Sequence, residues 1–292
     1  MSFLSRSRPL TPPPAPALFV AGGLSMYVGA AIAVWLFEEI SPWAVAWLRV
    51  VGAALVLLAW RRPGREAWRG RRLLLAGLFG TATALMNIAF YEAIARLPMG
   101  TAVAVEFMGP VVVAALGTRT RRDVGALGLA VLGVLLIADV RLSGSPLGVL
   151  FALLAAAFWA AYIVLGKRVA TGGNGFDDMA VGFTVAAVLL SPLAVGTGPV
   201  WGSPRLLVLA VGVGVLSTLV PYLLDQIVLR RVGQARFALL LALLPVTATV
   251  TGLVVLAQVP APLEAVGILC VVGAVALRTR DDKPAGPPPE PG

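Results

Sequence analysis

The stretch LLLAGLFGTATALMNIAFYEAIARLPMGTAVAVEFMGP, residues 73–110, decides the fold class. Two continuous apolar runs flank a short turn that contains Arg96 and Pro98. A helix needs about 20 such residues to cross the hydrocarbon core of a bilayer. Strands of a membrane barrel would instead alternate apolar and polar residues over segments of about ten. The stretch therefore predicts two transmembrane helices joined by a tight turn.

The same pattern extends over most of the 292 residues, of which 59% are hydrophobic and 13% charged. Soluble domains carry about 25% charged residues. The apolar runs predict an all-α integral membrane protein with ten transmembrane helices: Leu18–Phe37, Pro42–Trp60, Leu73–Leu97, Met99–Gly117, Val124–Ala138, Leu147–Gly166, Met179–Gly196, Arg205–Leu229, Arg236–Ala257 and Pro262–Leu277. The segments 1–17 and 278–292, which are rich in proline and charge, are predicted to be disordered tails.

The basic residues predict how these helices are oriented. With the N-terminus in the cytoplasm, 19 of the 23 arginine and lysine residues fall in cytoplasmic segments, and Arg96, Arg141 and Arg205 fall outside. Cytoplasmic loops of membrane proteins carry such an excess. Both termini are therefore predicted to be cytoplasmic, and the net charge of +9 needs no nucleic-acid partner. The chain has no histidine and one cysteine, Cys270, so we expect neither a metal site nor a cofactor.

The chain also repeats itself. Residues 208–245, VLAVGVGVLSTLVPYLLDQIVLRRVGQARFALLLALLP, have the length and turn pattern of residues 73–110 at an offset of 135. At that offset Thr83 aligns with Thr218, and Pro110 with Pro245. Two halves of five helices each, 18–140 and 145–277, would insert in opposite directions. The sequence thus predicts two inverted repeats, the architecture of secondary transporters whose sites lie at mid-membrane.

Charged residues inside the predicted spans are the first candidates for a site. Arg49, Glu106 and Asp225 lie within spans, where each charge costs about 2.5–3.5 kcal/mol on insertion scales. Pro110 cannot donate a hydrogen bond to the carbonyl of residue 106, so a kink is predicted beside the Glu106 carboxyl group. Glu92 lies near the outer end of its helix, where its side chain is expected to reach a vestibule.

Polar and aromatic residues at helical spacing extend this set. Candidates for substrate binding or coupling on the polar faces are Asn87, Tyr91, Thr218 and Tyr222, and Trp159 and Tyr162 are candidates for an aromatic wall; further kinks are predicted at Pro221 and Pro245. Two alternatives stay open: hydroxyl residues also serve helix packing, and the aromatic pair is also typical of an ordinary packing surface. Arg49 could bind substrate or form a structural ion pair, and Asp225 could be its partner or part of an inner gate.

The run PMGTAVAVEFMGPVVVAALGTR, residues 98–119, resembles the EamA-type branch of the drug/metabolite transporter superfamily, most closely its bacterial threonine/homoserine exporters. Further similar stretches are LRVVGAAL at 48–55, MNIAFY at 86–91, FWAAYIVLGKR at 158–168 and LSTLVPYLLDQIVL at 216–229. The resemblance implies a bacterial inner-membrane exporter of small metabolites, with ten helices in two inverted halves. It places Arg49, Asn87, Glu106, Pro110, Tyr162, Tyr222 and Asp225 on motif positions. Leu244 and Gln258 stand where the family usually has glutamate.

The leading hypothesis is secondary export of amino acids or similar zwitterions by proton antiport, with a small-molecule substrate, protons and the bilayer as partners. The alternatives are an exporter of another metabolite or drug class, a membrane-embedded enzyme, and a membrane scaffold that transports nothing. An enzyme would need a nucleophile or a metal cluster, and the sequence contains no G-x-S-x-G or phosphate-binding motif. We therefore expect the protein not to be an enzyme.

Overall fold

A computed structural model describes residues 14–117, 121–141, 145–170, 175–221, 224, 227–228, 231, 240–241 and 243–279. Within these ranges the regular secondary structure is helical, and no strand occurs. The elements are α1 (Ala15–Leu36), α2 (Pro42–Arg61), η1 (Arg65–Trp68), α3 (Gly70–Ile94), α4 (Met99–Glu106), α5 (Met108–Gly117), α6 (Arg121–Arg141), α7 (Pro146–Ala170), α8 (Gly175–Leu189), η2 (Ser191–Thr197), α9 (Gly198–Gly202), α10 (Pro204–Gly214), η3 (Val215–Leu219), α12 (Leu243–Leu256) and α13 (Pro262–Thr279).

Local sequence explains where several of these helices begin. Proline is the first residue of α2, α7, α10 and α13, a position at which its missing N–H removes no helical hydrogen bond. Ser203 caps α10 by accepting a hydrogen bond from the amide of Leu206, 3.4 Å from its hydroxyl oxygen. The helix starts are therefore set by residues that suit the first turn.

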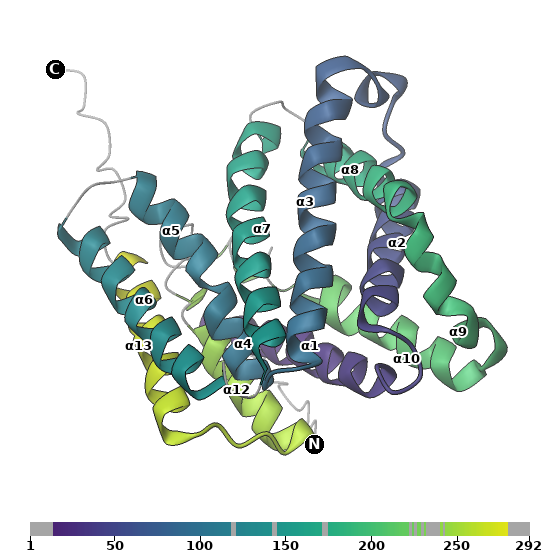
Figure 1. The fold of residues 1–292 in the computed structure, drawn as a ribbon. Coiled ribbons are helices and arrows are strands. Elements are labelled where there is room, and N and C mark those ends of the chain that lie inside the picture. The colour runs from purple at the N-terminus through teal and green to yellow at the C-terminus, as the bar shows by residue number, and fades with distance from the viewer. Residues whose placement is uncertain are drawn as a thin grey trace, which may run out of the picture.

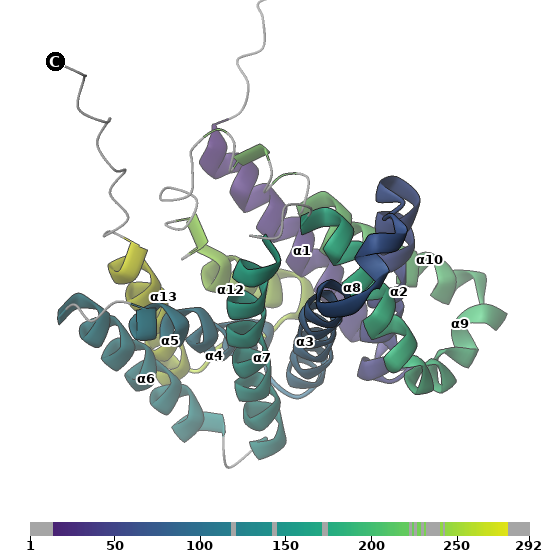
Figure 2. The same cartoon turned by 90° about the horizontal axis from the view of Figure 1, so that it is seen from above.

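The helices form a bundle in which α3 and α7 pack together at the centre (Figure 1). On one side α6 packs along α13, and on the other α2 packs against α8. The helix α1 contacts α10, η3 and α12, so the first span lies against elements from the end of the chain. Seen from above, α3 and α7 again separate the α6–α13 pair from α2 and α8 (Figure 2).

Every predicted span overlaps a described helix. Four helices, Ala15–Leu36, Pro42–Arg61, Gly70–Ile94 and Pro146–Gly166, are long and apolar enough to cross a membrane, and Gly175–Leu189 with Ser191–Gly202 forms a fifth, bent segment. Shorter apolar helices cover Met99–Val113, Val124–Ile137, Pro204–Thr218, Leu243–Leu256 and Pro262–Leu277. The prediction of an all-α membrane protein is confirmed within the described residues.

Two predicted spans differ from the expectation, the seventh in shape and the fifth in length. The seventh, Met179–Gly196, is bent by 68° where α8 ends and η2 begins. Pro192 is one of the first residues of η2 and cannot continue the hydrogen bonding of α8. The fifth span, expected at Val124–Ala138, is longer than predicted, because α6 has 21 residues and includes charged residues at both ends.

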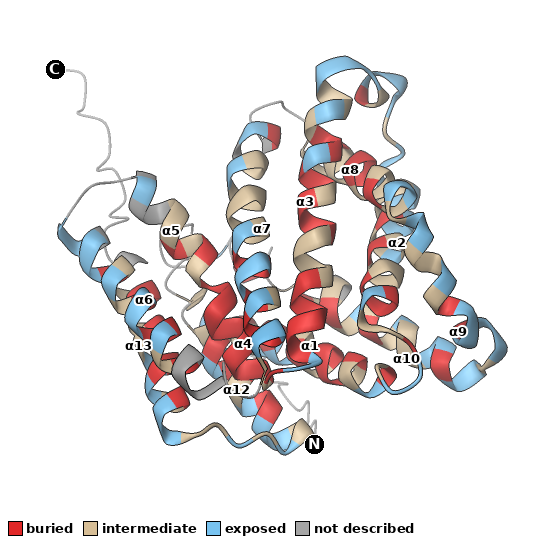
Figure 3. Cartoon of the chain, viewed as in Figure 1, coloured by how far each residue is buried: buried red, intermediate tan, exposed pale blue. Residues whose placement is uncertain are grey.

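The outer surface of the bundle is apolar. The side chains of Leu55, Val188, Val254 and Leu269 are each more than 60% exposed, as lipid-facing residues must be. Buried residues concentrate in α1, α3 and α4 near the centre (Figure 3). Some crossings are very close: a Cβ atom added to Gly80 of α3 would lie 2.0 Å from the carbonyl oxygen of Gly182 in α8. Glycine lets the two backbones touch there.

Candidate functional site

Arg49, half-buried in the middle of α2, makes three hydrogen bonds to other spans. Its Nε donates to the Thr218 hydroxyl at 3.0 Å, its Nη2 to the Ser217 carbonyl at 2.8 Å, and its Nη1 to the Tyr91 hydroxyl at 3.4 Å. The guanidinium carbon lies 5.8 Å from the centre of the Tyr91 ring. No described acidic group lies within 4 Å of Arg49, so its described partners are neutral.

Two of these partners belong to η3, a π-helical turn between α10 and Pro221. The amide of Val220 bonds to the carbonyl of Val215, five residues back, which leaves the Leu216 carbonyl without its α-helical donor. Ser25 of α1 donates to that carbonyl at 2.9 Å. The carbonyl of Ser217 would accept from residue 221, but proline has no N–H. Arg49 supplies the missing donor.

Glu106 is the last residue of α4, and α5 begins two residues later at Met108. Pro110 lacks the N–H that the Glu106 carbonyl would accept in a continuous helix. The Glu106 side chain is 8% exposed, and no described residue donates a hydrogen bond to it. Arg49 lies within electrostatic range without an ion pair shorter than 4 Å. A buried acid and a cation therefore share the interior without neutralising each other directly.

Tyr27 of α1 completes this group and was not among the predicted residues. It is 3% exposed, and Glu106 lies within electrostatic range of its hydroxyl. The sequence indicates the place of Tyr27 only indirectly. One part of α1 is narrow enough for other helices to approach closely, because it contains Gly22, Gly23 and Gly29. At Gly29 an added Cβ would lie 2.3 Å from the Ser217 hydroxyl oxygen.

The other predicted residues lie around this group with different partners. Asn87 donates to the Thr83 carbonyl of its own helix at 2.8 Å, so its described bond is local. The Trp159 ring meets Phe107 edge-on, with centroids 4.8 Å apart, beside the break between α4 and α5. The Tyr162 ring lies 5.0 Å from the ring of Phe79. Both rings therefore take part in packing between helices.

Two predicted residues, Tyr222 and Asp225, lie outside the described residues. Pro221 is buried directly after Val220, and Pro245 is buried in the first turn of α12. Within the described ranges, the structure thus gathers Arg49, Tyr91, Thr218 and Glu106 around the middle of the bundle.

Glu92 corrects one expectation. It was predicted to reach an outer vestibule, but its side chain is 4% exposed. Arg96, one helical turn away, donates to its Oε2 atom and lies over the ring of Phe151, 5.1 Å from the centroid. Pairing with Arg96 makes burial of the carboxylate tolerable, and only the cation reaches toward water.

Charged pairs join the start of α8 to α2 and α3. Arg61 Nε lies 3.0 Å from Asp177 Oδ1, and Arg72 Nε lies 2.5 Å from Asp178 Oδ1. Arg61 also lies over the ring of Phe176, 5.7 Å from its centroid. These contacts connect the second and third predicted spans to the seventh at one end of the bundle.

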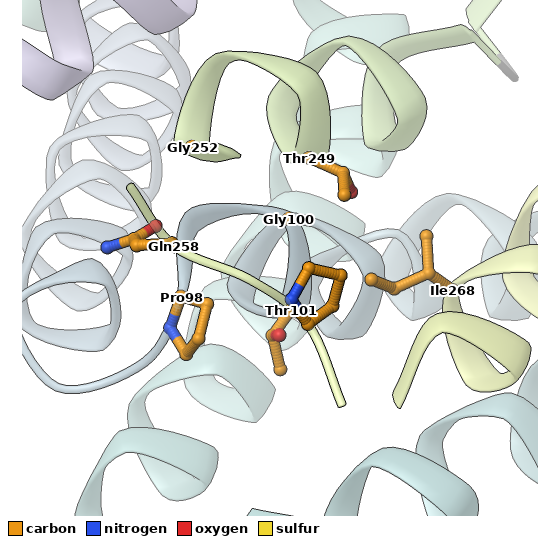
Figure 4. Close-up of a pocket in the computed structure, with 8 residues that line it drawn as sticks. Pro98, Gly100, Thr101, Thr249, Gly252, Gln258 and Ile268 are labelled. Atoms are coloured by element: carbon orange, nitrogen blue, oxygen red, sulfur yellow. The ribbon is translucent and has the colours of Figure 1, made fainter. Parts of the chain in front are cut away.

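Hydrogen bonds and a small pocket join α4 to α12 and α13. The amide of Met99 donates to Gln258 Oε1 at 2.9 Å, and Thr101 donates to the fully buried carboxylate of Glu264. Glu264 also accepts from the amide of Ala261 at 3.2 Å. Figure 4 shows the pocket among these elements, lined by Pro98, Gly100, Thr101, Thr249, Gly252, Gln258, Pro260 and Ile268. Both carboxylate oxygens of Glu264 are bonded, unlike those of Glu106.

Known proteins share both the sequence and the fold. Residues 146–280 match the EamA-like transporter family. The threonine/homoserine exporter RhtA of Salmonella typhimurium strain LT2 is 33% identical over 258 residues, which cover 86% of each chain. RhtA of Escherichia coli strain K12 is 32% identical over the same coverage.

One solved crystal structure covers 90% of this chain and 95% of its own, with a TM-score of 0.57 and 20% identity. That likeness concerns the fold alone. The two sequence matches agree with the earlier resemblance at residues 98–119, and the relatives are matched over most of their length. The chain belongs to the EamA-like transporter family.

Proposed function

We propose that the protein is a secondary active transporter that exports amino acids or similar small zwitterions. Its relatives are exporters of threonine and homoserine by name. The observation that carries the proposal is the pairing of Arg49 and Glu106 in one interior without a direct salt bridge. A zwitterion needs a cation for its carboxylate and an acid or neutral acceptors for its ammonium group, and guanidinium matches a carboxylate in bidentate geometry.

Glu106 is the proposed coupling group. Its carboxyl group has no described hydrogen-bond donor, so it can exchange a proton for the substrate's ammonium group. Proton antiport follows if the two occupy Glu106 in turn on opposite sides of the membrane, with the site exposed alternately to each side. The partners of this cycle are the small-molecule substrate, protons and the surrounding bilayer.

The proposed architecture is ten transmembrane helices in two inverted repeats, 18–140 and 145–277. The packing supports this architecture. When each span is replaced by the corresponding span of the other repeat, one described contact becomes another described contact. The third span, α3, packs on the sixth, α7; its counterpart, the eighth span with α10 and η3, packs on the first, α1. The fourth and ninth spans, α4 and α12, pack on each other, as do the fifth and tenth, α6 and α13.

The proposed location is a bacterial inner membrane, with both termini in the cytoplasm. Support comes from the 19 basic residues that this orientation places on the cytoplasmic side. In a variant whose Cys270 is replaced, a cysteine at Arg65 should react with an impermeant reagent only after the membrane is opened. A cysteine at Ser143 should react from outside. Labelling of the first in intact cells would contradict this orientation.

Flux into proteoliposomes tests the function. Purified protein should concentrate threonine or homoserine when a pH gradient is imposed, and it should lose that concentration when the gradient is collapsed. A panel of apolar drugs and sugar phosphates tests the second candidate, an exporter of another metabolite class. Chemical change of the substrate, instead of its accumulation, would favour the membrane-embedded enzyme. No accumulation of any amino acid would overturn the proposal.

A further inference from the structure

One edge of the Arg49 guanidinium group is already occupied in the way a carboxylate would occupy it. Nε and Nη2 lie on the same edge and are the pair that binds a carboxylate side-on. Here the two acceptors are the Thr218 hydroxyl at 3.0 Å and the Ser217 carbonyl at 2.8 Å. Both oxygens come from η3, from residues adjacent in sequence. The π turn thus presents two oxygens where a substrate would present two.

The Ser217 carbonyl is available because of Pro221. In a continuous helix a carbonyl at position 217 would accept from the amide of residue 221. Proline has none, and an unsatisfied carbonyl inside a membrane costs several kcal/mol. Arg49 satisfies it, so the bond is more than a chance contact. Among the described residues, Arg49 is the donor that a competing group would have to replace at the Ser217 carbonyl.

The turn itself is held by α1 and not by Arg49. Ser25 donates to the Leu216 carbonyl at 2.9 Å, and the Ser217 hydroxyl donates to the Met26 carbonyl at 3.2 Å. The backbone amide of Ser217 would lie 2.9 Å from a Cβ at Gly29, so the turn sits directly on the α1 backbone. The arginine side chain, which is long and half-buried, is therefore the part that can move.

We propose that η3 holds the place of the substrate carboxylate in the empty protein. This inference rests on the proposed function. A charged carboxylate accepts stronger hydrogen bonds from guanidinium than a hydroxyl and a carbonyl do, so it displaces them. The zwitterion brings its own donor, since its ammonium group can take the Ser217 carbonyl that Arg49 leaves. Tyr91 stays on the other edge of the guanidinium and keeps the side chain oriented.

The exchange links binding to a change between spans. In this structure Arg49 joins α2 to η3 through two hydrogen bonds. Once the substrate takes the same guanidinium edge, the direct connection is lost and the ligand lies between the two spans. Substrate binding thereby alters how α2 and the eighth predicted span are joined, which a site made only for binding would not do.

Thr218→Val tests the exchange, because it removes one competing oxygen while keeping the shape of the side chain. The dissociation constant for threonine or homoserine, measured by calorimetry on purified protein in detergent, should fall about three- to tenfold. The carboxamide analogues, which lack the charge, should bind no more tightly than to the wild type. Thr247→Val is the matched control, since Thr247 bonds to the Leu243 carbonyl of its own helix.

Pro221→Ala provides a second variant. It restores the backbone donor for the Ser217 carbonyl, so Arg49 has one competitor fewer and binding of the carboxylate should again tighten about threefold or more. Unchanged or weaker binding in Thr218→Val, with the wild type binding normally, overturns the exchange alone. Wild-type protein that binds no amino acid overturns the proposed function and the exchange with it.

Discussion

Two prolines interrupt the spans that line the site, and they lead to different chemistry. Pro110 follows Glu106 by four residues, and Pro221 follows Ser217 by four. Each removes the N–H that the earlier carbonyl would accept. At Ser217 a cation from α2 takes the exposed carbonyl. At Glu106 the helix breaks, and a carboxyl group stands there without a described donor.

Each proline removes the donor of one backbone carbonyl, and the helix that faces the break determines which group binds there. The break at η3 faces Arg49, so its two oxygens bind the guanidinium group. The break after Glu106 faces small residues and the α7 backbone, since a Cβ at Gly109 would lie 2.2 Å from the Ala156 carbonyl oxygen. One break is occupied by the protein itself, and the other leaves an acid available for exchange.

Glu106→Gln should have the largest effect. Without a group that exchanges protons at this break, proton-driven accumulation of substrate should fall to the level of protein-free liposomes. Glu264→Gln is the matched control, because Glu264 is also buried but already bonded to Thr101 and to the amide of Ala261. The control should keep its response to a pH gradient. Normal accumulation in Glu106→Gln would make Glu106 a structural residue.

Arg49→Lys tests the occupied break. Lysine keeps the charge but loses the planar fork, so substrate should bind roughly ten- to hundredfold more weakly while the protein still folds. Arg61→Lys, at a partly exposed ion pair with Asp177, should leave the dissociation constant unchanged. Wild-type affinity in Arg49→Lys would assign Arg49 to structure and not to binding.

Pro110→Ala tests whether the break after Glu106 affects the rate of transport and not the binding of substrate. The variant gives the Glu106 carbonyl a donor and lets α4 and α5 continue as one helix. Transport should slow a few-fold, roughly threefold, with an unchanged dissociation constant, since conformational steps limit many transport and catalytic cycles. Pro262→Ala, at the first residue of α13, should change neither quantity. A changed dissociation constant in Pro110→Ala would remove the distinction between the two breaks.

The smallest effect is expected in the melting temperatures, which test whether Arg49 and Asp225 form a structural ion pair. If Arg49 and Asp225 were a structural pair, each neutral variant would strand one charge and the double variant would recover stability. Three hydrogen bonds to Thr218, Ser217 and Tyr91 already engage the Arg49 guanidinium group, so we expect the shifts of Arg49→Gln and Asp225→Asn to add within about 2 °C. Recovery in the double variant would restore the ion-pair reading.

Much of this arrangement could be predicted from the sequence because only a few residue types, above all the charged ones, are so costly to place inside a bilayer. Arg49 and Glu106 stood out through the cost of burying charge, and Pro110 through its missing donor. For the first, second, third, sixth and tenth spans, the apolar runs predicted the helix bounds to within a few residues. Each of these signals depends on one residue and its own helix.

What the sequence could not show depends on contacts between helices. The π turn at Val215–Leu219 has no local signature beyond Pro221, and the choice of Thr218 and Ser217 as partners of Arg49 requires knowing that α2 faces η3. Tyr27 has no signal of its own in the sequence, because its position within electrostatic range of Glu106 depends on how α1 packs in the bundle. Glu92 was misjudged because its carboxylate is buried and pairs with Arg96, one helical turn along the same helix, which itself stays partly exposed.

The backbone contact between Gly80 and Gly182 has a mechanical consequence. With no side chain between them, α3 and α8 cannot move closer, but they can turn about this point. Tyr91 lies eleven residues further along α3, a lever arm of about 17 Å at 1.5 Å per residue. A turn of about 10° would carry its hydroxyl about 3 Å, further than a hydrogen bond can stretch. A small rotation at one glycine crossing is therefore enough to detach Tyr91 from Arg49.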